Sequence, residues 1–142
     1  MNKDNIRLLV LCTGNSCRSQ MAEAFFKHYF PQWQVYSAGT EPAGAVHPLM
    51  LEVMRERGFD LNGHHPEPVG KYLNLPFDIV LTVCDEANET CPVFQGDVKI
   101  RIHHGFDGPA MAEGSVEEKL EVFRRVRDEI EAFVRSFTIP HG

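Results

Sequence analysis

The stretch that decides the fold reads IRLLVLCTGNSCRSQM, from Ile6 to Met21. Its first part, up to Cys12, is short and mostly apolar, which is typical of a buried parallel strand. Turn-forming residues follow, namely Gly14, Asn15 and Ser16. Ser19 can then cap a helix that ends before Pro31. The stretch therefore predicts a buried strand that delivers a cysteine to a loop at the start of a helix.

Further strands and helices alternate along the rest of the chain. Apolar runs predict strands at Trp33–Ala38, Phe77–Cys84 and Val98–His103, and apolar residues at helical spacing predict helices at Pro48–Arg57 and Val116–Phe137. This alternation implies a parallel sheet with right-handed crossover connections. Because 142 residues suit a single core and no linker or repeat interrupts the pattern, we predict one α/β domain over residues 1–142.

The amino-acid composition limits which partners the chain can have. Hydrophobic residues make up 43% of the chain and charged residues 24%, which is ordinary for a globular protein. A net charge of −6 argues against nucleic acid and anionic membranes as partners. The sequence has neither a membrane-length apolar run nor the long apolar stretch of a signal peptide, so we expect a cytoplasmic protein, and we expect a monomer. Thiols stay reduced in the cytoplasm, so the four cysteines favour catalytic, redox or metal-binding roles.

The loop after the first strand combines the features of an oxyanion site. Backbone N–H groups at a helix start are unpaired, and the helix dipole adds partial positive charge, so phosphate-like anions bind there. Arg18 follows Cys12 after five intervening residues, and its guanidinium can hold two oxygens of a tetrahedral anion. The same field favours the thiolate of Cys12, to which Ser19 can donate a hydrogen bond. We therefore predict Cys12 as the nucleophile of a loop that holds the oxyanion with Cys12, Thr13, Gly14, Asn15, Ser16, Cys17 and Arg18.

Two other interpretations fit part of this loop. An inert core cysteine at a strand end explains Cys12 alone, but it does not explain Arg18 and Ser19 at these offsets. A nucleotide-binding P-loop needs a lysine that reaches the phosphates, and this loop contains none. The oxyanion loop with a cysteine nucleophile remains the favoured interpretation.

The longer sequence around this loop resembles a known family. The string CTGNSCRSQMAE at residues 12–23, followed by VYSAG at residues 35–39, is similar to the thioredoxin-coupled arsenate reductases. The resemblance extends to FRRVRDEI at residues 123–130, so it covers nearly the whole chain. It implies the fold and the C-x5-R loop of the low-molecular-weight protein tyrosine phosphatases, which is a three-layer α/β sandwich. Its central four-stranded parallel sheet has helices on both faces.

A second pair of cysteines lies in the segment CDEANETCP, which begins at Cys84. The spacing to Cys91 is not C-x-x-C, so a thioredoxin-type motif is excluded. Two structural cysteines are one interpretation. Zinc is another, but it requires Cys12, Cys17 or one of the paired histidines to converge on the pair, and the spacings match no common zinc pattern. A redox relay is the third, because Cys12 and Cys84 both end predicted strands, and such ends meet at one edge of a parallel sheet.

The resemblance favours the relay, since reductases of this family use three cysteines that match Cys12, Cys84 and Cys91. It implies arsenate, or phosphate, as the bound oxyanion and thioredoxin as the partner that reduces the final disulfide. Arsenate would be attacked by Cys12, Cys84 would release arsenite by attacking the Cys12 sulfur, and Cys91 would then take over the disulfide. No tightly bound cofactor is expected. The alternatives that remain open are a phosphatase acting on phosphate monoesters and a non-catalytic redox or metal-binding module.

The general acid is the point at which the sequence departs from the family. The family places an aspartate directly before a proline on a loop over the pocket, whereas residues 105–109 read GFDGP. The usual acid position is therefore Gly108, and Asp107 precedes it. We expect Asp107 to take over the protonation of the leaving oxygen, although a simple turn residue explains it nearly as well.

A potassium site is the last feature that the resemblance implies. Some reductases of this type bind the ion at positions that match Asn15, Glu23, Ser37 and Glu67. Oxygen ligands suit such a hard cation. Glu23 as an exposed helix residue and Glu67 as a loop residue are equally simple interpretations.

Overall fold

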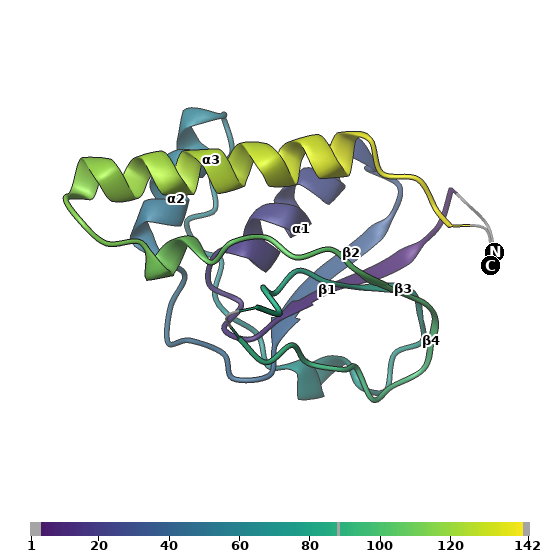
Figure 1. Cartoon of the computed structure of the whole chain (residues 1–142). Helices are drawn as coiled ribbons and strands as arrows, with labels where there is room; N and C mark the ends of the chain where they lie inside the picture. The colour runs from purple at the N-terminus through teal and green to yellow at the C-terminus, as the bar shows by residue number, and fades with distance from the viewer. Residues whose placement is uncertain (1–3, 88, 141–142) are drawn as a thin grey trace.

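The computed structural model describes residues 4–87 and 89–140, which form a parallel sheet with helices packed against it (Figure 1). The strands are β1 (Arg7–Cys12), β2 (Gln34–Gly39), β3 (Phe77–Thr82) and β4 (Val98–His103). They run parallel in the order β2-β1-β3-β4. The predicted α/β class and the four-stranded parallel sheet are confirmed.

The register of the sheet brings the strand ends to one edge. Cys12 pairs with Gly39 of β2, and Leu11 pairs with Thr82 of β3. Thr82 in turn lies opposite His103, the last residue of β4. Parallel α/β sheets bind their ligands at this carboxyl edge, so the site is expected there.

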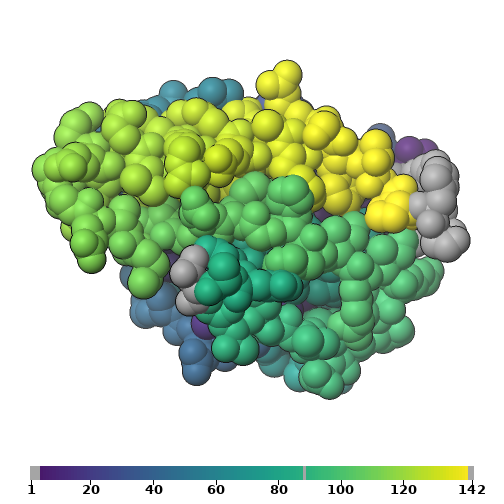
Figure 2. All heavy atoms as spheres, in the orientation of Figure 1, coloured from purple at the N-terminus to yellow at the C-terminus, as the bar shows by residue number. Residues whose placement is uncertain are grey.

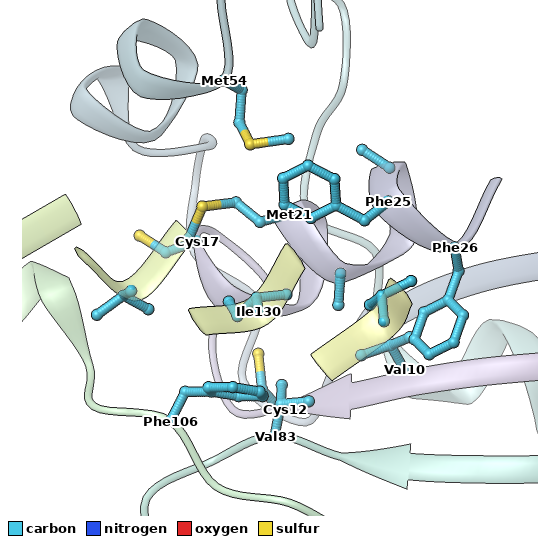
Figure 3. Packing of buried hydrophobic residues seen from close by; sticks show 14 of the residues in the cluster. Val10, Cys12, Cys17, Met21, Phe25, Phe26, Met54, Val83, Phe106 and Ile130 are labelled. Atoms are coloured by element: carbon cyan, nitrogen blue, oxygen red, sulfur yellow. The ribbon is translucent and has the colours of Figure 1, made fainter. Parts of the chain in front are cut away.

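The three α-helices pack together on one face of the sheet (Figures 1 and 3). They are α1 (Arg18–Tyr29), α2 (Pro48–Glu56) and α3 (Val116–Arg135). Val10 of β1 belongs to one buried cluster with Met21 and Phe25 of α1 and Ile130 of α3. Each large apolar side chain buried in this way contributes roughly 1.5–3 kcal/mol to folding.

The opposite face of the sheet has a thinner cover. Leu9 and Leu11 of β1 pack there with Tyr72 and Phe94. Tyr72 comes from the short 3-10 helix η1 (Val69–Tyr72), so the helix on this second face is a 3-10 helix rather than an α-helix. A second 3-10 helix, η2 (Pro109–Met111), precedes α3. Neither was predicted, because three or four residues show no hydrophobic periodicity.

The predicted helix cap at Ser19 is wrong. Helix α1 begins at Arg18 with Cys17 at the N-cap position, and no side chain caps it. Ser19 lies inside the first turn, fully buried, with its hydroxyl turned to Cys12. A hydroxyl engaged with the sulfur is not available to cap the helix.

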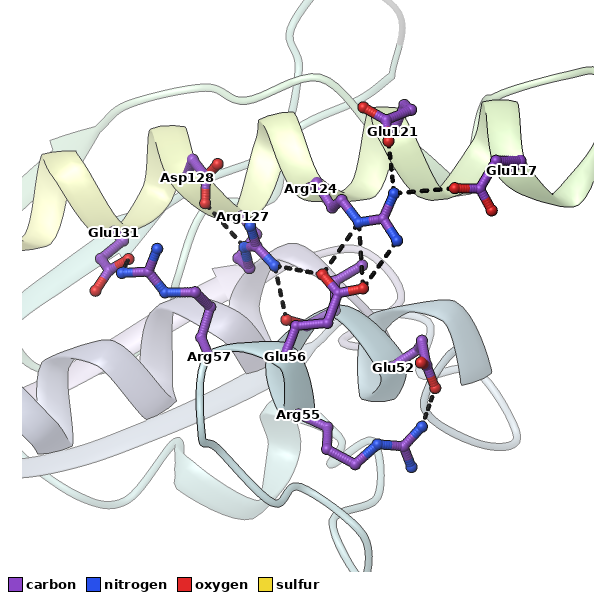
Figure 4. A network of polar contacts seen from close by, with 11 residues as sticks. Glu52, Arg55, Glu56, Arg57, Glu117, Glu121, Arg124, Arg127, Asp128 and Glu131 are labelled. Carbon is purple, nitrogen blue, oxygen red and sulfur yellow. Dashed lines mark hydrogen bonds and ion pairs between the residues drawn. The ribbon is translucent and has the colours of Figure 1, made fainter.

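Helix α2 is attached to α3 by ion pairs as well as by apolar contacts (Figure 4). Glu56 accepts from Arg127 at 2.9 Å and from Arg124 at 2.9 Å. Arg127 is buried and also donates to the carbonyl of Val53 at 2.9 Å. In the part of the chain that the structure describes, no helix has the length and apolar character that would let it cross a membrane.

Candidate active site

The loop between β1 and α1 turns the sulfur of Cys12 toward hydrogen-bond donors. The backbone N–H of Asn15 donates to Cys12 Sγ at 3.2 Å, and Ser19 Oγ lies 3.0 Å from the sulfur. Ser19 Oγ itself accepts from Asn15 Nδ2 at 2.7 Å, so its hydrogen is free to point at the sulfur. Two donors on one sulfur are the surroundings that a nucleophilic thiolate needs.

Asn15 fixes the shape of this loop. Its φ of 53° lies in the left-handed region, which asparagine tolerates better than most residues. The side-chain amide is buried and donates to Ser37 Oγ at 2.9 Å, while its Oδ1 accepts the N–H of Glu67 at 2.9 Å. The loop is thereby tied to β2 and to the segment that follows α2.

Gly39 allows β2 to pass close behind the loop. A Cβ at this position would lie 2.4 Å from the carbonyl oxygen of Thr13, a distance that no side chain can adopt. The segment that follows β2 also bonds to the loop, since the N–H of Glu41 donates to the carbonyl of Thr13 at 2.9 Å. Gly39 was not among the predicted site residues, although a glycine that closes a predicted strand often marks a close backbone approach.

A small cavity of about 170 Å³ opens above the loop. It is lined by Cys12, Thr13, Gly14, Asn15, Ser16, Cys17, Arg18, Glu89, Gly108, Pro109, Ala110 and Met111. The predicted oxyanion residues therefore all border one cavity, and its size suits a tetrahedral anion. None of these lining residues, all in the described part of the chain, is aromatic, whereas a phosphotyrosine ring needs aromatic walls.

Arg18 lies in this cavity with both ends of its guanidinium engaged. Nη1 donates to the carbonyl of Phe106 at 3.0 Å, and Nη2 lies 2.8 Å from a carboxylate oxygen of Glu89. The bond to Phe106 orients the guanidinium toward the loop. Glu89 was not singled out from the sequence, because only the path of its loop brings it to Arg18.

Cys17 is also in the loop but differs from Cys12 in its surroundings. It is buried, and this burial is the main reason that its pKa is raised to about 11. The nearby Cys12 raises the pKa further, while the contact with Ser16 lowers it. Cys17 therefore stays a neutral thiol near pH 7, which leaves Cys12 as the nucleophile candidate of the pair.

The second cysteine pair forms a disulfide. Cys84 and Cys91 are bonded to each other, with their Cα atoms 5.7 Å apart, while Cys12 and Cys17 are free. Cys84 is buried two residues past the end of β3, and the N–H of the intervening Val83 donates to Leu11 at 3.1 Å. Cys12, which ends β1, and Cys84, which follows β3, thus lie at the same edge of the sheet on neighbouring central strands.

His103 at the end of β4 also reaches this pair. A ring nitrogen of His103 and the two sulfurs lie within 4.8 Å of one another. One of the paired histidines therefore does converge on the cysteines, which the zinc interpretation required. The three side chains could hold a thiophilic ion once the disulfide is reduced, but bonded sulfurs do not act as ligands.

Asp107 lies away from the cavity. Its side chain is 63% exposed, and its carboxylate pairs with Arg125 of α3 at 3.0 Å. Gly108 does line the cavity, and a Cβ there would lie 3.7 Å from the Arg18 guanidinium. The structure thus does not bring Asp107 to the oxyanion loop, because the position that points inward carries no side chain.

Three of the four predicted potassium ligands border a second cavity, of about 320 Å³. These are Glu23, Ser37 and Glu67. Ser37 Oγ donates to Glu23 at 2.5 Å, and each carboxylate also pairs with a lysine of its own segment, namely Lys27 and Lys71. Asn15 contacts both ends of this group through Ser37 and the N–H of Glu67. The donors suit a hard cation, although the lysines compete for the same oxygens.

Known proteins resemble this chain in sequence and in fold. The family model of the low molecular weight phosphotyrosine protein phosphatases matches residues 7–139. An arsenate reductase of Halalkalibacterium halodurans is 47% identical over 138 residues, which is 96% of this chain and 96% of the relative. The crystal structure of an arsenate reductase from Archaeoglobus fulgidus has a TM-score of 0.70 at 33% identity, covering 90% of this chain and 95% of its own. A thioredoxin-dependent arsenate reductase of Corynebacterium glutamicum has a TM-score of 0.57 at 26% identity, covering 95% of this chain and 64% of its own. The chain therefore belongs to the low molecular weight phosphotyrosine protein phosphatase family and, within it, groups with the arsenate reductases.

Proposed function

We propose that this chain reduces arsenate to arsenite, with Cys12 as the nucleophile. Arsenate binds in the loop, where the backbone N–H groups and Arg18 balance its charge. Cys12 Sγ bonds to arsenic, and one arsenate oxygen takes up protons and leaves as water. The product of this step is a covalent arsenic adduct on Cys12, with arsenic still in its oxidised state.

The electrons for the reduction come from the cysteines. The Cys84 thiolate attacks Cys12 Sγ, and the electron pair of the broken sulfur–arsenic bond leaves with arsenic, which departs as arsenite. Cys91 then attacks Cys84, which moves the disulfide to Cys84–Cys91 and returns Cys12 as a thiolate. The observation that carries this proposal is the Cys84–Cys91 disulfide beside a free Cys12, the arrangement with which such a cycle ends.

We infer that thioredoxin reduces this disulfide. Cys91 is the more exposed partner and follows an acidic surface segment, so an external thiolate can reach it. The related reductase from Corynebacterium glutamicum is a thioredoxin-dependent enzyme. A cysteine pair that must be re-reduced after each turnover suits the cytoplasm. The chain acts as a monomer in this proposal, without nucleic acid or membrane.

The test is arsenate-dependent NADPH oxidation coupled through thioredoxin and thioredoxin reductase, with hydrolysis of an aryl phosphate measured alongside. Cys12→Ser is expected to lose both activities, because both need the nucleophile. Cys91→Ser is expected to complete at most one arsenate turnover while it keeps its phosphate-ester hydrolysis. Sustained arsenate turnover by Cys91→Ser with thioredoxin would show that the relay is wrong.

Phosphate-ester hydrolysis is a secondary activity of the same loop in this proposal. The nucleophile and Arg18 serve both reactions, but the cavity offers phosphotyrosine no aromatic wall among its lining residues. Asp107, the acid expected from the sequence, faces Arg125 instead of the cavity. An arsenate oxygen leaves as water and depends less on a strong acid than an alkoxide does. Reduction is therefore favoured over ester hydrolysis.

We also propose that a potassium ion stabilises the fold at Asn15, Glu23, Ser37 and Glu67. Occupation would raise the thermal midpoint in potassium chloride over that in sodium chloride at equal ionic strength, because binding favours the folded state. Glu23→Gln is expected to remove the difference between the two salts. Equal midpoints for the unaltered protein in both salts would contradict the site.

A further inference from the structure

Glu89 contacts the group that should hold the oxyanion. Its carboxylate oxygens lie 2.8 and 3.1 Å from Arg18 Nη2. The pair is largely shielded from solvent, since the Arg18 side chain is 10% exposed and that of Glu89 is 26% exposed. The other terminal nitrogen of Arg18, Nη1, donates to the carbonyl of Phe106, so both terminal nitrogens are engaged, and Nη2 is the one engaged by a carboxylate.

A carboxylate and an arsenate compete for such a nitrogen. Both are anions that accept charge-assisted hydrogen bonds from a guanidinium. Glu89 also lines the same 170 Å³ cavity as Cys12, so an oxyanion entering the loop meets a negative charge already in place. Binding therefore requires Glu89 to move or carries the repulsion of two anions at short range.

The position of Glu89 depends on the loop that the disulfide closes. Glu89 lies between Cys84 and Cys91, and its carboxylate accepts the N–H of Asp85 at 3.0 Å. Its own N–H donates to the carbonyl of Asp85 at 2.9 Å. This segment, teal in Figure 2, lies at the surface against the green segment that follows β4. The disulfide and these two bonds hold the Glu89 carboxylate over Arg18.

We propose that Glu89 is a redox-dependent gate on the oxyanion loop. While the Cys84–Cys91 disulfide stands, its carboxylate holds Arg18 and weakens oxyanion binding, and reduction of the disulfide releases it. The inference rests on the proposed function, since it assumes that the loop binds an oxyanion. The gate has a chemical use, because an arsenic adduct formed on Cys12 while Cys84 is oxidised has no thiol to resolve it.

Calorimetric titration with inorganic phosphate tests the gate without any turnover, since thiols do not reduce phosphate. Four forms of the full chain are compared with the unaltered protein, namely Glu89→Gln and Glu86→Gln, each with the disulfide formed and reduced. Glu86→Gln is the matched control, because Glu86 lies on the same loop but is 68% exposed and pairs with His103. Both substitutions remove one negative charge from the same segment.

The oxidised unaltered protein is expected to bind phosphate about tenfold more weakly than the reduced one, the scale of one charge-assisted hydrogen bond. Glu89→Gln is expected to erase this difference by strengthening binding to the oxidised protein, while Glu86→Gln keeps it. The same redox difference in Glu89→Gln, or an equal gain in both states, overturns the gate but leaves arsenate reduction standing. Absence of phosphate binding in every form overturns both proposals.

Discussion

Gly108 leaves the wall of the oxyanion cavity that precedes Pro109 without a side chain. Its φ of −79° and ψ of 102° suit any residue, and a Cβ would make ordinary contacts at 3.7 Å. Gly108→Asp is therefore expected to fold normally and to raise aryl phosphate hydrolysis about a hundredfold, the usual scale of a general acid. Steady-state rates across pH measure this, and the gain should disappear above the pKa of the new carboxyl group.

The control for this change is Asp107→Asn. Because Asp107 is exposed and pairs with Arg125, its loss is expected to leave the hydrolysis rate and the acid side of the pH profile unchanged. A large loss of rate in Asp107→Asn would show that this residue turns inward during the reaction. An unchanged rate in Gly108→Asp would show that protonation of the leaving group does not limit hydrolysis.

How far single residues of the site could be predicted depends on their distance along the chain. Cys12 and Arg18 lie on one continuous strand–loop–helix segment, so their common cavity follows from spacing alone. Cys84 needed one further rule, that parallel strands end at the same edge. Glu89 lies on a long loop, and His103 ends an edge strand. No local sequence pattern shows that the loop brings Glu89 to Arg18, or that His103 reaches the cysteine pair. Asp107 was expected to act because it directly precedes Gly108, the position at which the family places its acid, but adjacent residues point in different directions.

At the scale of elements, the apolar strands and helices could be predicted within about two residues. Val98–His103 was predicted with the bounds that the structure has, whereas β3 ends at Thr82 rather than Cys84. Hydrophobic periodicity fixes where an element is buried but not where its last hydrogen bond falls. The short helix η1 was not predicted, because Tyr72 holds it by packing against the sheet, and this contact depends on tertiary structure.

The attachment of α2 to α3 depends on one carboxylate. Hydrogen bonds from Arg124, and then from Arg127, hold the pKa of Glu56 below its usual value near 4.5. The unfolded chain therefore binds this proton more readily, so the pair stabilises the fold above about pH 4.5, and the contribution is lost as pH falls through the lower folded pKa. Glu56→Gln is expected to lower the free energy of unfolding by roughly 1–3 kcal/mol at pH 7, because buried Arg127 loses its partner.

Urea unfolding at pH 7 and near pH 3 measures this effect. The loss caused by Glu56→Gln should shrink as pH falls through the lowered pKa of Glu56, because the native carboxylate then takes up its proton. Glu52→Gln is the matched control, since Glu52 lies on the same helix and pairs with Arg55 of that helix at the surface (Figure 4). It is expected to change stability little at either pH. Equal losses for the two variants would contradict a special role of Glu56.

At the scale of the whole molecule, the reactive segments border a rigid sheet. The central strands β1 and β3 are buried between two apolar clusters, one under the three α-helices and one under η1. The segment that contains the disulfide loop adds no side chain to either cluster. This holds for residues 85–87 and 89–93, which are the described part of that segment. The cysteine relay and the proposed gate need this loop to rearrange while Cys12 stays in place.

Amide hydrogen exchange of the oxidised and reduced protein tests this division. Reduction is expected to speed exchange about tenfold or more at residues 85–93, because local opening of a surface loop costs little once its covalent ring is cut. Amides of β1 and β3 should exchange at unchanged rates, since their opening requires both clusters to separate. Cys91→Ser cannot form the disulfide, so it should show the fast pattern under both conditions. Faster exchange in β1 on reduction would mean that the disulfide stabilises the sheet itself. It would contradict the inference that only the loop at residues 85–93 becomes mobile.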